Sequence, residues 1–267
     1  MSSQLARALS ASNEPLDLGV LHSELDRGLA ARAAIGLVVL ATDQTMEHEF
    51  RELIRLPGVA FYESRVLNDA DITPQTLRAI GPRITPSVEL ILPGIRLDVV
   101  AFGCTSATMT LGEEAVFAEI RKARPDAACT TPVTAALAAF RTLGVKGVGL
   151  LTPYAPEINK GLIAYFAGRA APIAAVATFD RRDDRDAARI SVASIEAAAE
   201  RLAASPGVDA IFVSCTSLRV AEAVARLEGR IGVPVTSSNH AMAWHCLRLA
   251  GIEEAVPAGK LFALPAA

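Results

Sequence analysis

The chain has 267 residues, of which 51% are hydrophobic and only 5% aromatic, and its formal net charge is −3 at pH 7. Lysine and arginine form no long run, which argues against a nucleic-acid partner. No apolar stretch approaches the roughly 18 residues that span a bilayer, which argues against a membrane protein. We therefore expect a cytoplasmic α/β protein, with its four cysteines reduced.

The predicted elements alternate regularly after a weakly patterned start. Residues 1–30 are interpreted as a tail that leads into a short helix near 21–33. Short apolar runs then alternate with longer amphipathic segments, which predicts strand–helix–strand units and parallel sheets. Strands are expected in two series, the first near 35–41, 59–63, 98–103 and 127–130 and the second near 147–152, 173–178, 209–214 and 233–236.

The two series repeat one another. The segment from Asp98 to Ser106 matches the segment from Asp209 to Ser217 at an offset of 111 residues, and "GLVVLAT" at 36 matches "GVGLLTP" at 147 at the same offset. Such a repeat predicts two similar Rossmann-like lobes with four-stranded parallel sheets, related by a pseudo-two-fold axis, at 31–145 and 146–267. The active site is expected in the cleft between these lobes.

Each lobe carries the triplet C-T-S at the end of its third predicted strand. Ligands of open parallel sheets bind beyond the carboxyl ends of the strands, so both triplets are predicted to face the cleft. The candidate residues from the triplets are Cys104, Thr105, Ser106, Cys215, Thr216 and Ser217.

Two facing thiols can serve as opposed acid and base. A thiol pKa of about 8.5 falls near cations or a helix N-terminus, so such a pair can hold one thiolate and one thiol at neutral pH. This arrangement suits inversion at a carbon next to a carboxylate, or thiolate addition to an activated double bond. A cysteine at a strand end is more often a packing residue, and we interpret Cys129 and Cys246 in that way.

Helix starts are expected to differ at the two triplets. After Cys215, "LRVAEAVARLEG" predicts a helix almost at once, with its positive end directed at the loop. After Cys104, Thr110 and Glu113 resemble a capping box, which predicts a free loop at 105–109 that folds over a ligand.

Four segments resemble the aspartate/glutamate racemase superfamily: "GLVVLATDQTMEHEF", "VVAFGCTSAT", "GVGLLTPYAPEIN" and "VPVTSSNHAMAWHCLRLAG". Within it they are most similar to the maleate cis-trans isomerase and arylmalonate decarboxylase branch, and in particular to its ectoine-utilisation proteins. The resemblance runs from residue 35 to 252. It implies a reaction without cofactor or metal, and a homodimer or homotetramer.

The resemblance also implies roles for individual residues. In maleate isomerases the first cysteine attacks the double bond and the second supplies a proton, which assigns these roles to Cys104 and Cys215. Tyr154 of "LTPY" is expected to hydrogen-bond a substrate carboxylate. Arylmalonate decarboxylases keep only the second cysteine, so the presence of Cys104 counts against that activity.

Two aspartates depart from the pattern of maleate isomerases. Asp43 in "ATDQT" stands where those proteins carry a carboxylate-binding asparagine, and Asp184 corresponds to a second such asparagine. Two anions about 4 Å apart repel by roughly 4 kcal/mol at an effective dielectric constant of 20, so we expect a substrate that bears an amine. The alternatives are a helix-capping role for Asp43 and a solvated loop for Asp184.

The main hypothesis is a cofactor-independent racemase or epimerase of a small amino-bearing carboxylate of the ectoine-degradation type. The alternatives are a maleate isomerase with Cys104 as nucleophile, an arylmalonate-type decarboxylase, and a catalytically silent binding protein. His240 is placed near the cleft by its strand-end position, and His48 on the first helix, but surface or core positions suit both equally well.

Overall fold

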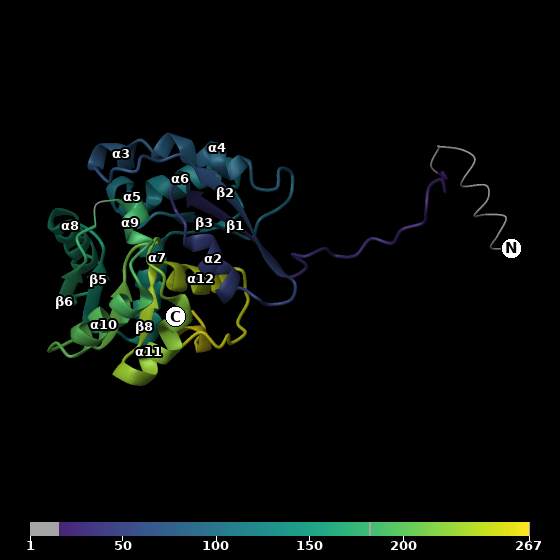
Figure 1. The fold of residues 1–267 in the computed structure, drawn as a ribbon. Helices are drawn as coiled ribbons and strands as arrows, with labels where there is room; N and C mark the ends of the chain where they lie inside the picture. The colour runs from purple at the N-terminus through teal and green to yellow at the C-terminus, as the bar shows by residue number, and fades with distance from the viewer. Residues whose placement is uncertain (1–15, 182, 267) are drawn as a thin grey trace.

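In a computed structural model of the chain, residues 16–181 and 183–266 are described, and they form two four-stranded sheets (Figure 1). Every strand pair is parallel, and the strand orders are β2-β1-β3-β4 and β6-β5-β7-β8. All eight predicted strands are confirmed. Their bounds are β1 Ala33–Leu40, β2 Val59–Val66, β3 Val99–Gly103, β4 Ala128–Thr130, β5 Val148–Thr152, β6 Ile173–Thr178, β7 Ala210–Val213 and β8 Val235–Ser237.

Helices follow the strands in both halves. The first half contains α2 Met46–Leu53, α3 Pro74–Arg78, η1 Gly81–Arg83, α4 Ile84–Glu89, α5 Thr105–Leu111, α6 Glu113–Ala123 and α7 Pro132–Leu143. The second contains α8 Pro156–Ala167, α9 Asp184–Ala187, α10 Val192–Ala203, η2 Ala221–Ala223, α11 Val224–Ile231, α12 Ser238–Leu249 and η3 Leu261–Ala263.

The aspartates that open the two repeated segments have the same structural role. Asp98 accepts a hydrogen bond from the Ala34 backbone N–H at 2.9 Å, at the start of β1. Asp209 accepts from the backbone N–H groups of Lys146 and Gly147, at the start of β5. Each carboxylate thereby satisfies the first donors of the neighbouring central strand, and the sequence repeat is a repeat of structure.

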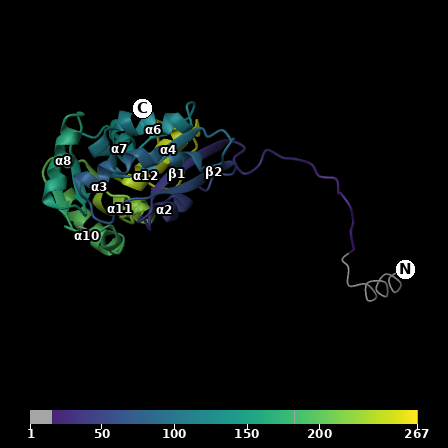
Figure 2. The ribbon, with the colours of Figure 1, turned by 90° about the horizontal axis from the view of Figure 1, so that it is seen from above.

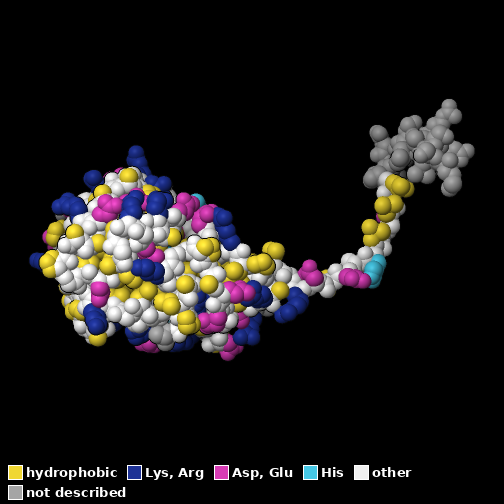
Figure 3. All heavy atoms as spheres, turned by 90° about the horizontal axis from the view of Figure 1, so that it is seen from below, with side chains coloured by type: hydrophobic (Ala, Val, Ile, Leu, Met, Phe, Trp, Pro, Cys, Tyr) yellow, Lys and Arg dark blue, Asp and Glu magenta, His cyan; other side chains and the backbone are white. Residues whose placement is uncertain are grey.

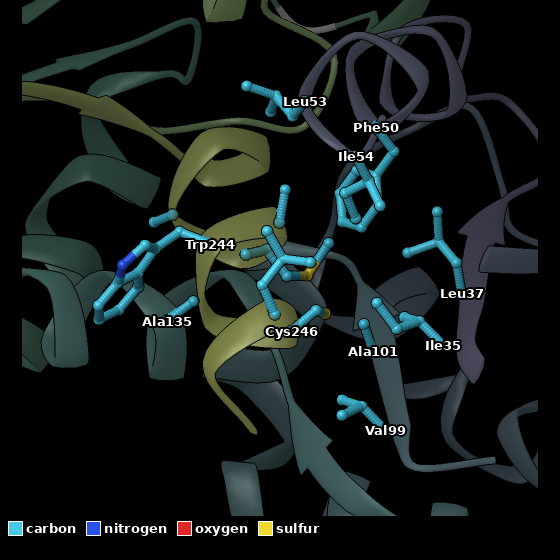
Figure 4. Close-up of a cluster of buried hydrophobic side chains, with 14 of the residues drawn as sticks. Ile35, Leu37, Phe50, Leu53, Ile54, Val99, Ala101, Ala135, Trp244 and Cys246 are labelled. Atoms are coloured by element: carbon cyan, nitrogen blue, oxygen red, sulfur yellow. The ribbon is translucent and has the colours of Figure 1, made fainter. Parts of the chain in front are cut away.

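The last helix of each half packs on the sheet of the other half. Phe140 of α7 belongs to a buried cluster built on β5 and β7, whereas Cys246 of α12 belongs to a cluster with Ile35 and Val99 of the first sheet. Trp244 of the same helix lies beside Ala135 of α7 (Figure 4). The helices α7 and α12 also contact each other between the two sheets (Figure 1). The halves are therefore joined by two exchanged helices.

The N-terminal segment differs from the prediction. Residues 16–32 contain no helix, so the short helix expected near 21–33 is wrong; residues 1–15 of the predicted tail lie outside the described part. The segment runs away from the globular body (Figure 2) and carries exposed apolar side chains, including Val20 and Leu25 (Figure 3). Because the segment packs against little of the protein, no tertiary contacts offset the entropy cost of forming a helix there.

Within residues 16–181 and 183–266, no helix is long and apolar enough to cross a bilayer.

Candidate active site

Both triplet cysteines line one pocket between the two halves. Cys104 follows β3 and Cys215 follows β7, and each flanks the point where the chain switches sides of its sheet. The pocket has a cavity volume of about 30 Å³, room for about two water molecules. Seven of the nine predicted site residues line it, namely Cys104, Thr105, Ser106, Tyr154, Asp184, Cys215 and Thr216.

Cys104 is held by the start of a helix. It is the N-cap of α5, and its Sγ accepts a hydrogen bond from the Ala107 backbone N–H at 3.3 Å. The Ser106 hydroxyl lies 3.7 Å from the same sulfur. The loop predicted at 105–109 is therefore wrong: α5 occupies these residues and ends at Gly112, whose φ of 90° favours glycine.

Cys215 is followed by irregular backbone. Leu218 donates its N–H to the Cys215 carbonyl at 3.3 Å, but no helix begins before η2 at Ala221. The helix predicted almost at once after this triplet is present, but it begins later than expected, at Ala221. The Ser217 N–H and the Tyr154 side chain lie near the Cys215 sulfur and act to lower its pKa, which burial raises.

Tyr154 connects the chain after β5 to both thiols. Its side chain is 3% exposed and its backbone N–H donates to Thr152 Oγ1 at 3.2 Å. Burial and the nearby Cys215 and Cys104 raise the pKa of its hydroxyl well above the usual value. The hydroxyl is therefore protonated at neutral pH and can donate a hydrogen bond into the pocket.

The structure corrects the expected ionisation of the thiols. Burial raises the pKa of Cys104 to about 11, and burial together with Asp184 raises the pKa of Cys215. Asp43 adds to both effects. In the unliganded protein both sulfurs are thus thiols at neutral pH, and the expected thiolate requires a change of local charge.

Asp43 lies behind the pocket wall and does not line the pocket. Its Oδ1 accepts from the backbone N–H groups of Thr45 and Met46 at 2.7 and 2.8 Å, which is the capping role weighed as its alternative. Its buried Oδ2 accepts no hydrogen bond of normal geometry from any residue in the described ranges. Burial raises the pKa of Asp43 to about 6, although the nearby Thr216 side chain lowers it slightly.

Asp184 lies at the pocket, and not in the solvated loop that its charged neighbours suggested. It is 8% exposed and joins the two halves, because its Oδ2 accepts from the Thr42 hydroxyl at 2.9 Å and its Oδ1 from the Ser217 hydroxyl at 2.6 Å. Ser217 itself does not line the pocket. Its hydroxyl instead positions the aspartate.

Sequence reasoning missed one wall of the pocket. The chain after β2 supplies Asn68, Asp69 and Asp71, and α3 with its flanks supplies further lining residues. The Asn68 amide donates to Thr42 Oγ1 at 2.9 Å, beside Asp184. The signal was available, because "NDAD" at 68–71 begins a few residues after the strand predicted near 59–63, at the same edge of the sheet as Cys104.

The remaining candidates lie away from the pocket. His240 is fully buried, and its ring bonds to Thr236 and to the Ala258 carbonyl, while His48 forms an exposed ion pair with Glu222. Cys246 is buried among apolar neighbours, as expected, and Cys129 is partly buried in β4. Across residues 16–181 and 183–266, no group of three His, Cys, Asp or Glu side chains has an arrangement that could hold a metal ion.

Comparison with known proteins agrees with this geometry. The family model described as arylmalonate decarboxylase matches residues 36–262. The arylmalonate decarboxylase of Bordetella bronchiseptica is 37% identical over 131 residues, which cover 46% of this chain and about half (52%) of that protein. The maleate isomerase of Nocardia farcinica is 28% identical over 238 residues, covering 85% of this chain and 94% of that protein.

A solved structure extends the similarity to the fold. A mutant of the Nocardia farcinica maleate cis-trans isomerase, solved with a covalently bound succinylcysteine intermediate, superimposes with a TM-score of 0.78 at 26% identity. The superposition covers 86% of this chain and 98% of that one. With two parallel sheets, a pocket between them and a family match over most of its length, the chain belongs to the arylmalonate decarboxylase family, whose fold the maleate isomerases share.

Proposed function

We propose that the protein is an isomerase of small carboxylates that works through Cys104 and Cys215 without a cofactor, by the chemistry of maleate isomerases. The observation that carries this proposal is that two buried thiols, from equivalent strand ends, line one pocket. The similarity to an isomerase solved with a succinylcysteine favours sulfur addition over the other reactions of the family.

In the proposed reaction Cys104 first loses its proton to solvent, and the thiolate adds to one carbon of an activated C=C bond. The π electrons move to the other carbon and its carboxylate, and Cys215 donates its proton to that carbon. Rotation about the resulting single bond changes the configuration. The proton then returns to Cys215, the C–S bond breaks, and the sulfur leaves with its electron pair as the trans product forms. Tyr154 donates a hydrogen bond to a substrate carboxylate.

The charge of the pocket bears on the substrate. Its described lining contains Asp69, Asp71 and Asp184 but no Lys, Arg or His side chain. A dicarboxylate dianion would meet these carboxylates and raise the thiol pKa values further. An ammonium group on the substrate would offset the negative charge and favour the thiolate.

The acidic lining therefore favours a second candidate, racemisation or epimerisation of an amino-bearing carboxylate of the ectoine-degradation type. One sulfur would remove the α-proton and the other would return a proton from the opposite face. The two candidates share the site and the cysteines. They differ in whether a C–S bond forms.

The distinguishing experiment is proton NMR in deuterated water with a panel of substrates. The proposed reaction converts maleate, or an amino-bearing unsaturated acid, to the trans isomer, and both Cys104→Ala and Cys215→Ala abolish the conversion. Exchange of the α-hydrogen of 2,4-diaminobutyrate or its acetyl derivatives would support the racemase. Carbon dioxide release from phenylmalonate would support a decarboxylase, and no turnover of any substrate would refute an isomerase in favour of a binding protein.

The substrate charge is tested by Asp184→Asn, because this aspartate lines the pocket. The hydroxyls of Thr42 and Ser217 can rotate to suit the amide, so the local geometry is retained. We expect binding of dicarboxylates to improve and binding of amino-bearing substrates to weaken. Asp43 does not line the pocket, so Asp43→Asn is expected to change substrate binding in the same direction as Asp184→Asn but by less.

A further inference from the structure

The backbone of the segment after Cys215 depends on hydrogen bonds from other parts of the chain. Cys104 is fixed by α5, which begins at the next residue, whereas residues 216–220 form no helix or strand. All of these residues except the exposed Arg219 are nevertheless buried, and their backbone N–H and C=O groups require hydrogen bonds. Several of these bonds come from the other half of the protein, which the first sheet organises.

Glu49 supplies two of them. This residue of α2 is 2% exposed, and its Oε1 accepts from the backbone N–H groups of Val220 and Ala221 at 2.6 and 2.7 Å. Its Oε2 accepts from the Asn239 amide at 2.7 Å. One turn earlier on the same side, Thr45 donates its hydroxyl to the Ser217 carbonyl at 3.0 Å.

Asn239 extends this contact to the residue next to Cys215. The same Nδ2 that binds Glu49 also donates to the Thr216 carbonyl at 2.7 Å. The Thr216 carbonyl and the ionised Glu49 carboxylate are both acceptors, so the amide nitrogen of Asn239 faces them. The Asn239 Oδ1 is left without a partner among the described residues. The polar contacts of Asn239 are therefore the two hydrogen bonds that its side-chain nitrogen donates.

The pair has no counterpart at the first triplet. The repeat offset of 111 places exposed Lys160 at the position of Glu49, and the offset of 107 places Pro132 at the position of Asn239. Neither can form such contacts. The pair therefore belongs to the one triplet that lacks a helix to hold it.

We propose that Glu49 of the first half and Asn239 of α12 are positioning residues that fix the backbone of the segment after Cys215, and so set the geometry of the second cysteine relative to Cys104. The effect on turnover rests on the proposed function. The effect on the Cys215 sulfur does not.

Glu49→Gln is the informative substitution. The side-chain oxygen of the introduced glutamine can keep the bonds from Val220 and Ala221, but its amide nitrogen then faces the nitrogen of Asn239. The clash is relieved only if the Asn239 amide flips, which turns its oxygen toward the Thr216 carbonyl and breaks that bond. Asn239→Ala breaks the same bond from the other side while leaving the backbone contacts of Glu49 intact.

The test is alkylation of the full-length protein with iodoacetamide, followed by peptide mass spectrometry. The rate at Cys215 is divided by the rate at Cys104 in the same molecules, so that global loosening, which exposes both, cancels. We expect this ratio to change by about threefold or more in folded Glu49→Gln and Asn239→Ala, because thiol reactivity follows local access and ionisation. Glu52→Gln changes a partly exposed residue of the same helix that pairs with Arg55; it is the matched control and should leave the ratio unchanged.

Turnover provides the second measurement. On a substrate that the wild type converts, kcat should fall about tenfold or more with KM changed far less, because small misplacements of a reacting group are costly. A ratio equal to that of the wild type in both variants would overturn the proposal. If Glu49→Gln does not fold, Asn239→Ala decides alone. A changed ratio in a protein that converts no substrate would refute the proposed function and leave the positioning pair intact.

Discussion

The buried carboxylate of Glu49 makes a definite contribution to the pH dependence of stability. Burial and, to a lesser extent, nearby Asp43 raise its pKa from the ordinary 4.5 to about 7. Three hydrogen bonds to the carboxylate oppose this rise. The folded protein therefore holds this proton more tightly than the unfolded chain does. Stability from this residue is greatest at low pH and is lost as the pH rises from about 4.5 through 7.

The pKa gives the size of the effect. A rise from 4.5 to about 7 corresponds to about 3 kcal/mol at 1.36 kcal/mol per pKa unit, most of it between pH 5 and pH 8. His240 acts in the opposite direction, because burial lowers its pKa to about 4 and its stabilising neutral form is lost as the pH falls. The wild-type curve alone therefore mixes both effects.

The assay is urea unfolding of the wild type and Glu49→Gln at pH 5 and at pH 8. Relative to the wild type, the variant should lose about 2 to 3 kcal/mol less of its unfolding free energy between these two pH values, with unchanged m-values. Glu52→Gln should behave as the wild type. Parallel curves for Glu49→Gln and the wild type would show that Glu49 is ionised in both folded and unfolded protein, and would refute the reasoning.

Three further outcomes follow from the same contacts. Since burial raises the pKa of Cys104 to about 11, its alkylation rate should rise about tenfold per pH unit from pH 7 to pH 10; a plateau near pH 8 would contradict this ionisation. Tyr154→Phe removes the hydroxyl that lies near Cys215 and should slow turnover by about tenfold or more with little change in melting temperature; an unchanged kcat would show that the hydroxyl is dispensable. Trp244→Ala should lower the unfolding free energy by about 3 to 5 kcal/mol, as measured in urea, because this fully buried side chain of α12 packs in the core beside Ala135 of α7; a loss below about 1 kcal/mol would contradict that packing.

The residue at which a helix begins after each triplet could not be predicted from the sequence. "TSATMTL" contains residues that favour turns and strands, yet it forms α5, because Cys104 caps its first turn and Gly112 ends it. "VAEAVARLEG" has a strong helical pattern and forms η2 and α11, but the helix begins only at Ala221. The backbone N–H groups at this start, on Val220 and Ala221, bind Glu49. Both outcomes were set by side chains acting on backbone groups, one of them from a residue 171 positions away.

The sequence by itself determined the strands and the placement of Cys104 and Cys215 at strand ends, because alternation and the internal repeat are local properties of the chain. Tertiary structure decided which charges meet. Asp184 enters the pocket from a charged stretch, Asp43 is turned to cap a helix, and Glu49 reaches across to the other half. These contacts depend on desolvation and on packing between distant segments. No local pattern encodes them.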